Sequence, residues 1–218
     1  MKKKSVFLPI LLTFTLLFIT GLFNVSADEA KDGDKPEKEY QFRGYKWLTP
    51  YDEIKENETK DIVLNLGDYY TTDTEEEKSF AINTTVSGLD STAGFLFNDD
   101  WELTMGIYQI TTEHATQLDY YSDFTILQEA LHSLYGEPTY TDQTGLDDID
   151  LSNTQDLISG ILDGGQLNDY WISNDLSGIM LVCRADEGTV RPGLIYFQSI
   201  NDLGILYDKL SAPNTDGL

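Results

Sequence analysis

One long amphipathic pattern between two groups of alternating segments most constrains the fold of this chain. Apolar side chains recur there at intervals of four, three, four and three residues, which lines one face of a helix. They are Tyr120, Phe124, Leu127, Leu131 and Leu134. Asp119 or Ser122 can cap the start, Gly136 suits the left-handed position after the last turn, and Pro138 prevents continuation. We therefore expect a helix that lies across a sheet and covers it.

Three segments of period-two alternation precede this helix and three follow it. The six segments are 80–86, 93–97, 101–110, 169–173, 177–184 and 193–199. Such alternation is typical of strands, and the short polar turns between the segments predict antiparallel meanders. Two strands plus a loop is the alternative for the first group.

Shorter helix signals precede each group of strands. Thr49 as N-cap and Pro50 at the first helical position predict a helix start, after a first strand over 40–48. Ser152 and Gln155 have the spacing of a capping box and predict the start of a second short helix. A helix-then-meander order thus occurs twice.

These elements define an α+β fold with two layers, because the helices gather on one face of antiparallel meanders. We expect a single domain over 40–210, built from possible tandem units at 40–112 and 119–200. A last short helix through Leu203, Leu206 and Leu210 would close it.

The N-terminal residues of the chain predict export. Residues 1–27 combine three lysines, an apolar run and a small-residue cleavage pattern ending at Ala27, which is typical of a bacterial signal peptide. Retention as an anchor is the alternative. Residues 28–39 read as a disordered acidic spacer and 211–218 as a disordered tail. The single cysteine, Cys183, lies far from the apolar run, so we expect no lipid attachment there and a secreted protein.

The net charge of the chain limits the classes of partner that it can bind. The chain has 38 acidic against 14 basic residues and a formal charge of −24. Because binding to nucleic acid or anionic lipid depends on lysine and arginine, we expect neither partner, and no membrane association after signal cleavage. Such acidity is typical of a well-solvated surface; a cationic partner or loosely held Ca²⁺ is the alternative.

Two short motifs resemble those of a known group of proteins. Phe42-Arg43-Gly44-Tyr45-Lys46-Trp47 and Tyr135-Gly136-Glu137-Pro138 resemble the "FRG-x-x-W" and "YGEP" segments of small exported Gram-positive proteins of uncharacterised function. Their fold is similar to the helix-on-sheet units of β-lactamase inhibitor proteins and outer-membrane assembly lipoproteins. The resemblance implies the same α+β fold and supplies no catalytic residue.

No residue cluster carries recognisable catalytic chemistry. His114 with Glu113 and Asp119 could contribute to a metal site, but their spacing indicates too few converging ligands. The acids around Asp148 lack the pattern of a calcium loop, and Cys183 reads as a small buried side chain. We therefore predict no catalytic residue, no metal and no cofactor.

The aromatic content points to binding. The chain has 13 tyrosines, and tyrosine and tryptophan commonly anchor interfaces. On an uncovered sheet face we predict exposed rings at Trp47, Tyr108, Tyr170 and Trp171; packing of such rings against polar loops is the alternative.

The sequence thus favours an exported, non-catalytic module that binds another exported or surface protein or associates with the cell envelope. One alternative is an acid-dependent hydrolase or a Ca²⁺-dependent enzyme that uses surface carboxylates. A further alternative is an assembly or structural factor of the envelope.

Overall fold

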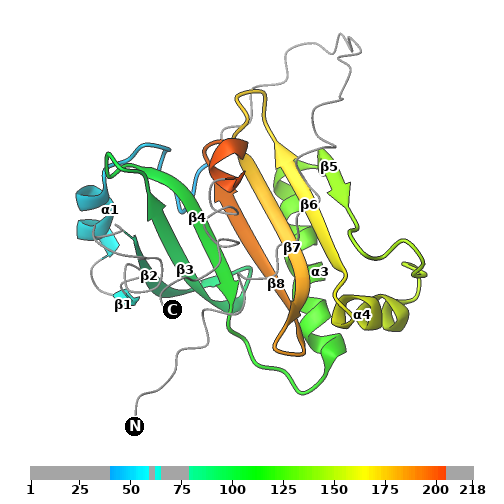
Figure 1. Cartoon of the computed structure of the whole chain (residues 1–218). Helices are drawn as coiled ribbons and strands as arrows, with labels where there is room; N and C mark the ends of the chain where they lie inside the picture. The colour runs from blue at the N-terminus through cyan, green and yellow to red at the C-terminus, as the bar shows by residue number, and fades with distance from the viewer. Residues whose placement is uncertain (1–39, 59–61, 65–78, 205–218) are drawn as a thin grey trace, which may run out of the picture.

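A computed structural model describes residues 40–58, 62–64 and 79–204. The predicted signal peptide, acidic spacer and tail lie outside the described residues. The described strands form one antiparallel sheet in the order β1-β2-β3-β4-β8-β7-β6-β5 (Figure 1). They are β1 (Ile62–Leu64), β2 (Ser79–Val86), β3 (Leu89–Phe97), β4 (Leu103–Ile110), β5 (Tyr140–Asp142), β6 (Gln166–Ile172), β7 (Gly178–Asp186) and β8 (Thr189–Phe197).

The strand order repeats itself in reverse about the middle of the sheet. β1 to β4 form one half, β5 to β8 form the other, and the last strand of each half meets its counterpart where Met105–Gln109 pairs with Gly193–Phe197. Each half contains a short helix, a three-residue edge strand and a meander of three long strands, and a long helix lies between the two halves in the sequence. The helices are α1 (Tyr51–Glu58), α3 (Gln117–Tyr135) and α4 (Thr154–Leu162). This confirms the α+β fold.

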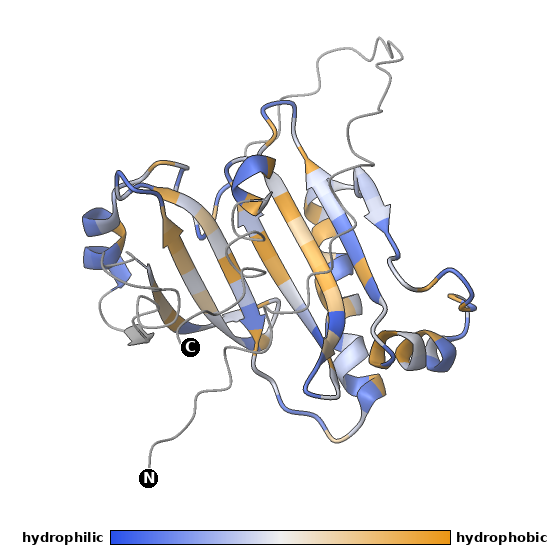
Figure 2. Cartoon of the chain, viewed as in Figure 1, coloured by the Kyte–Doolittle hydropathy of each residue, from blue (hydrophilic) through white to orange (hydrophobic). Residues whose placement is uncertain are grey.

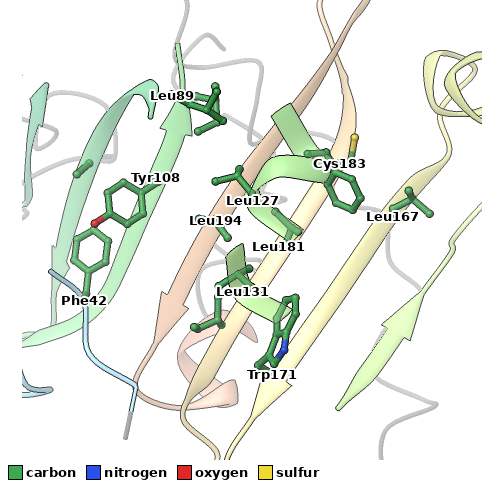
Figure 3. Close-up of a cluster of buried hydrophobic side chains, with 14 of the residues drawn as sticks. Phe42, Leu89, Tyr108, Leu127, Leu131, Leu167, Trp171, Leu181, Cys183 and Leu194 are labelled. Carbon is green, nitrogen blue, oxygen red and sulfur yellow. The ribbon is translucent and has the colours of Figure 1, made fainter. Parts of the chain in front are cut away.

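The long helix α3 packs on one side of the sheet, behind the strands in Figure 1. Four members of its predicted stripe are buried, and Leu127 and Leu131 lie near Leu181 and Leu194 of the sheet (Figure 3). The fifth, Leu134, is 72% exposed because it lies in the last turn. We call this covered side of the sheet the helix face.

The helix ends differ in part from expectation. α3 begins earlier than predicted, because Thr116 is its N-cap and accepts a hydrogen bond from the backbone N–H of Asp119. Asn153, one residue after the predicted Ser152, caps α4 through its side-chain oxygen. Gly136 ends α3 with a φ of 76°, as the sequence predicted.

Segment 40–48 does not form the predicted strand. It contains a single bridge between Phe42 and Tyr45, and the Phe42 ring packs directly over β4 at Gly106. A Cβ atom at Gly106 would lie 2.1 Å from Cγ of Phe42. The alternation in this segment therefore reflects a packed plug rather than a strand.

The face opposite the helices carries a second apolar cluster. Its members come from four adjacent strands and alternate with residues of the helix face. They are Met105, Tyr170, Met180, Val182, Ile195 and Phe197, which we call the second-face cluster. All six are buried, so the expectation of an uncovered sheet face is wrong. In the part of the chain that the structure describes, Ile200 and Leu203 pack on this cluster from beyond the strands.

Candidate functional site

The rings predicted to be exposed are mostly buried, so that prediction was wrong for three of them. Tyr108 and Trp171 belong to the helix-face core (Figure 3), and the indole nitrogen of Trp171 donates to the Gly136 carbonyl at 2.8 Å. Tyr170 lies in the second-face cluster, where burial raises its pKa. Trp47 is half-buried. The four rings therefore do not share one surface.

The physical reason is that both faces of the central strands are covered. Tyr170 and Trp171 do point to opposite faces, as alternation predicted, but neither face is open to solvent. A large ring that can be buried on either side is stabilised there by loss of its apolar surface from water.

The acids and the histidine near the start of α3 form pairs that hold the loop before it. Nε2 of His114 lies 2.9 Å from a carboxylate oxygen of buried Asp123, not near Asp119. Glu113 accepts hydrogen bonds from the Tyr120 hydroxyl at 2.7 Å and from Arg191 at 3.0 Å. Among the described residues, no three His, Cys, Asp or Glu side chains converge to hold a metal ion. The geometry is that of a structural clasp.

Two further groups that could carry chemistry are enclosed in the helix-face core. Asp169 is buried and accepts hydrogen bonds from Gln128 of α3 at 2.6 Å and Thr141 of β5 at 2.7 Å. The thiol of Cys183 is fully buried, and burial raises its pKa. The prediction that Cys183 is a small buried side chain is confirmed, whereas no sequence signal marked Asp169.

Three bulky side chains adopt left-handed backbone conformations at one end of the sheet. Leu48 and Trp101 have φ values of 66°, and Leu176 has a φ of 69°. These three residues, which we call the left-handed rim, lie where β4 and β7 begin and β8 ends. Leu48 and Leu176 are 43% and 48% exposed. Both are therefore strained in backbone and open to solvent.

Backbone hydrogen bonds hold the rim in place. The N–H of Leu48 donates to the carbonyl of Leu103 at 2.9 Å, and the carbonyl of Trp101 accepts from Tyr51 at 2.8 Å. The carbonyl of Leu176 accepts from Ile200 at 3.0 Å. The rim is thus built from three separate segments that meet at one end of the same sheet.

The opposite end of the sheet also contains left-handed residues, there within tight hairpin turns. Ser87 and Glu187 have φ values of 51° and 48°, and a glycine with positive φ follows each. They are the first residues of two-residue hairpin turns, which require positive φ at both positions. Asparagine, aspartate and glycine, rather than leucine, are typical of the positive-φ positions in such turns. No sequence signal marked Leu48 or Leu176, because φ cannot be read from residue type.

Comparison with protein-family models, with curated proteins and with solved structures finds no match to this chain. Within the described residues, none of the helices combines the length and apolarity that crossing a membrane requires.

Proposed function

We propose that this protein is an exported, non-catalytic binding module that contacts another exported or surface protein through the left-handed rim. The observation that carries the proposal is the placement of Leu48 and Leu176, exposed and in left-handed conformations, at one sheet end.

Left-handed leucine needs an explanation. Left-handed backbone costs a residue with a Cβ about 1–2 kcal/mol. Leu48 and Leu176 recover only part of that cost through packing, because nearly half of each side chain is exposed. Strained conformations that persist in this way cluster at ligand clamps and binding sites. The backbone strain at Leu48 and Leu176 therefore supports the proposal that the left-handed rim is a binding surface.

The charges around the rim indicate the kind of partner. Asp99 and Asp100 precede Trp101, and Asp175 precedes Leu176; all three acids are exposed. An apolar centre surrounded by acids suits a protein with apolar side chains and a basic surround, because complementary charges steer association and exclude wrong partners. The net charge of −24 acts in the same direction.

The chemistry-bearing groups support binding rather than catalysis. His114, Asp123 and Glu113 hold a loop, Asp169 holds α3 to the sheet, and Cys183 is enclosed. None of the contacts described for these groups places an activated nucleophile next to a base.

The experiment replaces the rim leucines with a residue that tolerates left-handed backbone. The double variant Leu48→Asn/Leu176→Asn removes both apolar side chains and reduces strain, so we expect it to unfold at higher urea, by about 0.5–1 kcal/mol per site. The matched control is Ser87→Asn/Glu187→Asn, which makes the same substitution at left-handed positions of the opposite end.

Binding is measured by cross-linking each purified protein to the envelope and culture-fluid fractions of the host and quantifying captured proteins by mass spectrometry. We expect a basic protein that wild type and the control capture equally, and that the rim variant loses at least tenfold. Equal capture by all three proteins, or no basic protein enriched by wild type, contradicts the proposal.

A further inference from the structure

We propose that the loop at 111–116 is a hinge between the two halves of the sheet, and that a second copy of this chain is the partner when the hinge opens. The two copies would exchange halves through the β4·β8 pairing. The group that holds the hinge shut, which we call the clasp, consists of Glu113, His114, Tyr120, Asp123 and Arg191. This inference concerns a different surface from the rim and does not depend on the proposed function.

The two halves meet in the sheet along one strand pair. Met105–Gln109 of β4 pairs with Gly193–Phe197 of β8, and Figure 2 shows hydrophobic residues on both strands. The rings of Tyr108 and Tyr196 meet across this pairing at 6.1 Å between centroids. Each of these contacts joins the first half to the second, so the matching half of another copy can make it in the same register. Half-exchange of this kind is a common route to dimers in proteins built from repeated units.

The long helix that follows the loop packs on the second half. α3 lies on β7 and β8, and its first residue, Gln117, is bonded to the turn between these strands. The side chain of Gln117 accepts from the N–H of Val190 at 2.9 Å and donates to the carbonyl of Gly188 at 3.1 Å. α3 would therefore move with β5 to β8 when the halves separate. The loop at 111–116, between β4 and α3, is the place where the chain would turn (Figure 1).

The first two residues of the loop are tied to the first half. The N–H of Thr111 donates to the carbonyl of Asp90 in β3 at 2.8 Å. The hydroxyl of Thr112 donates to the same carbonyl at 3.4 Å. These two residues therefore continue the first half beyond the end of β4.

The clasp ties the next residues of the loop to the second half. Glu113 accepts from Arg191 of β8 at 3.0 Å, and Nε2 of His114 lies 2.9 Å from a carboxylate oxygen of Asp123 in α3. The Tyr120 ring lies between these two pairs, edge-on to the His114 ring at 5.0 Å and 4.9 Å from the Arg191 guanidinium. The ties thus change from one half to the other between two neighbouring residues.

This arrangement keeps the hinge shut. The Cα atoms of Thr112 and Glu113 are about 3.8 Å apart, so one set of ties must break before the two halves of a chain can separate. An exchanged dimer would recover the β4·β8 pairing but not both sets of ties, so the clasp favours the single-chain arrangement. Without the clasp, residues 113–116 are free to act as the hinge. The balance between monomer and exchanged dimer then depends on chain concentration.

The test reads out which chain supplies each strand of the β4·β8 pairing. Ile107 and Ile195 are directly opposite in this pairing. A chain with Ile107→Cys and another with Ile195→Cys can therefore join there by a disulfide only after exchange. Oxidised glutathione accepts the two electrons and two protons that the thiols lose, and native Cys183 is fully buried. One chain with both substitutions should form the disulfide internally, which checks the geometry.

The mixed chains are compared in three backgrounds at equal concentration. One has the unchanged loop, and one has the clasp opened by Glu113→Ala/His114→Ala/Asp123→Ala, which removes both members of the buried pair. The matched control, Gln128→Ala/Asp169→Ala, removes a buried pair that ties α3 to β6 and leaves the loop unchanged. We expect the opened clasp to accelerate the interchain disulfide at least tenfold, measured by non-reducing gel electrophoresis. The control should behave as the unchanged loop.

Three outcomes overturn the inference. The opened clasp could give the internal disulfide but no interchain one. The control could exchange as fast as the opened clasp, which would assign exchange to lost stability. Chains with Ile107→Cys alone could dimerise, which would identify β4 against β4. If the triple variant does not fold, Glu113→Ala decides, because this side chain is 75% exposed and its removal leaves the buried pair intact. Exchange no faster than with the unchanged loop would then overturn the inference.

Discussion

The two faces of the sheet differ in what the described chain places on them. The helix face is closed by α3, by α4 and by the plug around Phe42, and its core extends across both halves of the sheet. The second-face cluster is smaller, centred on β7 and β8, and meets one helical turn of the described chain. Both are nevertheless buried. An apolar sheet face is therefore not evidence of a free surface.

The two faces of the sheet also differ in how their buried acidic side chains are paired. On the helix face the buried acids have partners: Asp123 contacts His114, and Asp169 accepts from Gln128 and Thr141. Alternation places Asp186 on the second face, and there burial raises its pKa. Burial of an ionised acid is costly unless it is well paired, and the charges of Arg184 and Arg191 offset only part of that cost at Asp186.

The largest expected effect lies on the helix face. Phe42 is fully buried and its ring contacts Phe95, Tyr108 and Tyr196 at centroid distances of 5.1, 5.0 and 5.5 Å. Phe42→Ala leaves a cavity above Gly106 and should lower the free energy of unfolding by about 3–5 kcal/mol, measured by urea denaturation. Lys46→Ala, at an exposed position in the same segment, is the control. A loss below about 1 kcal/mol would mean that segment 40–48 is not part of the core.

A second substitution tests whether the second face is an equal core. Met180 is fully buried at the centre of the second-face cluster, so Met180→Ala should cost about 2–3 kcal/mol in urea. Asn83→Ala, at an exposed strand position, should be nearly neutral. If Met180→Ala lowers the free energy of unfolding no more than Asn83→Ala does, the second face contributes little to stability. The two faces would then not be equal cores.

The fold was predictable because its signals are local and repeated. The stripe of α3, the end at Gly136 and the long strands follow from periodicities of 3.6 and 2 and from turn residues. The edge strands β1 and β5 were missed because three residues are too few to show alternation. The prediction of a strand over 40–48 was wrong because a packed loop and a strand can share the same alternation of apolar and polar residues.

The site was less predictable, although one signal was available. The run from Ile179 to Cys183 is apolar at every position, which is typical of a strand buried on both faces rather than one. Because Tyr170 pairs with Met180 of this run, cover on both faces of the run argues against an exposed ring at Tyr170. The left-handed rim has no comparable signal, because leucine is not typical of left-handed positions. Leu176 lies in a local turn closed by its own N–H bond to the Ser173 carbonyl, whereas the N–H of Leu48 donates to the distant carbonyl of Leu103.

The smallest expected effect concerns Asp186 and depends on pH. Because burial raises the pKa of Asp186 above its usual value, the folded chain holds this proton more tightly than the unfolded chain. Stability from the protonated form is fully present below the unfolded pKa and is lost as pH rises through the folded pKa. Asp186→Asn cannot ionise, so its free energy of unfolding should gain on that of wild type as pH rises from about 3 to about 7. Urea denaturation across this range measures the difference, with Asp99→Asn in an exposed turn as control. A difference for Asp186→Asn that is flat with pH would show that the second face leaves this carboxylate as well solvated as an exposed one, and the contrast between the faces would then rest on apolar packing alone.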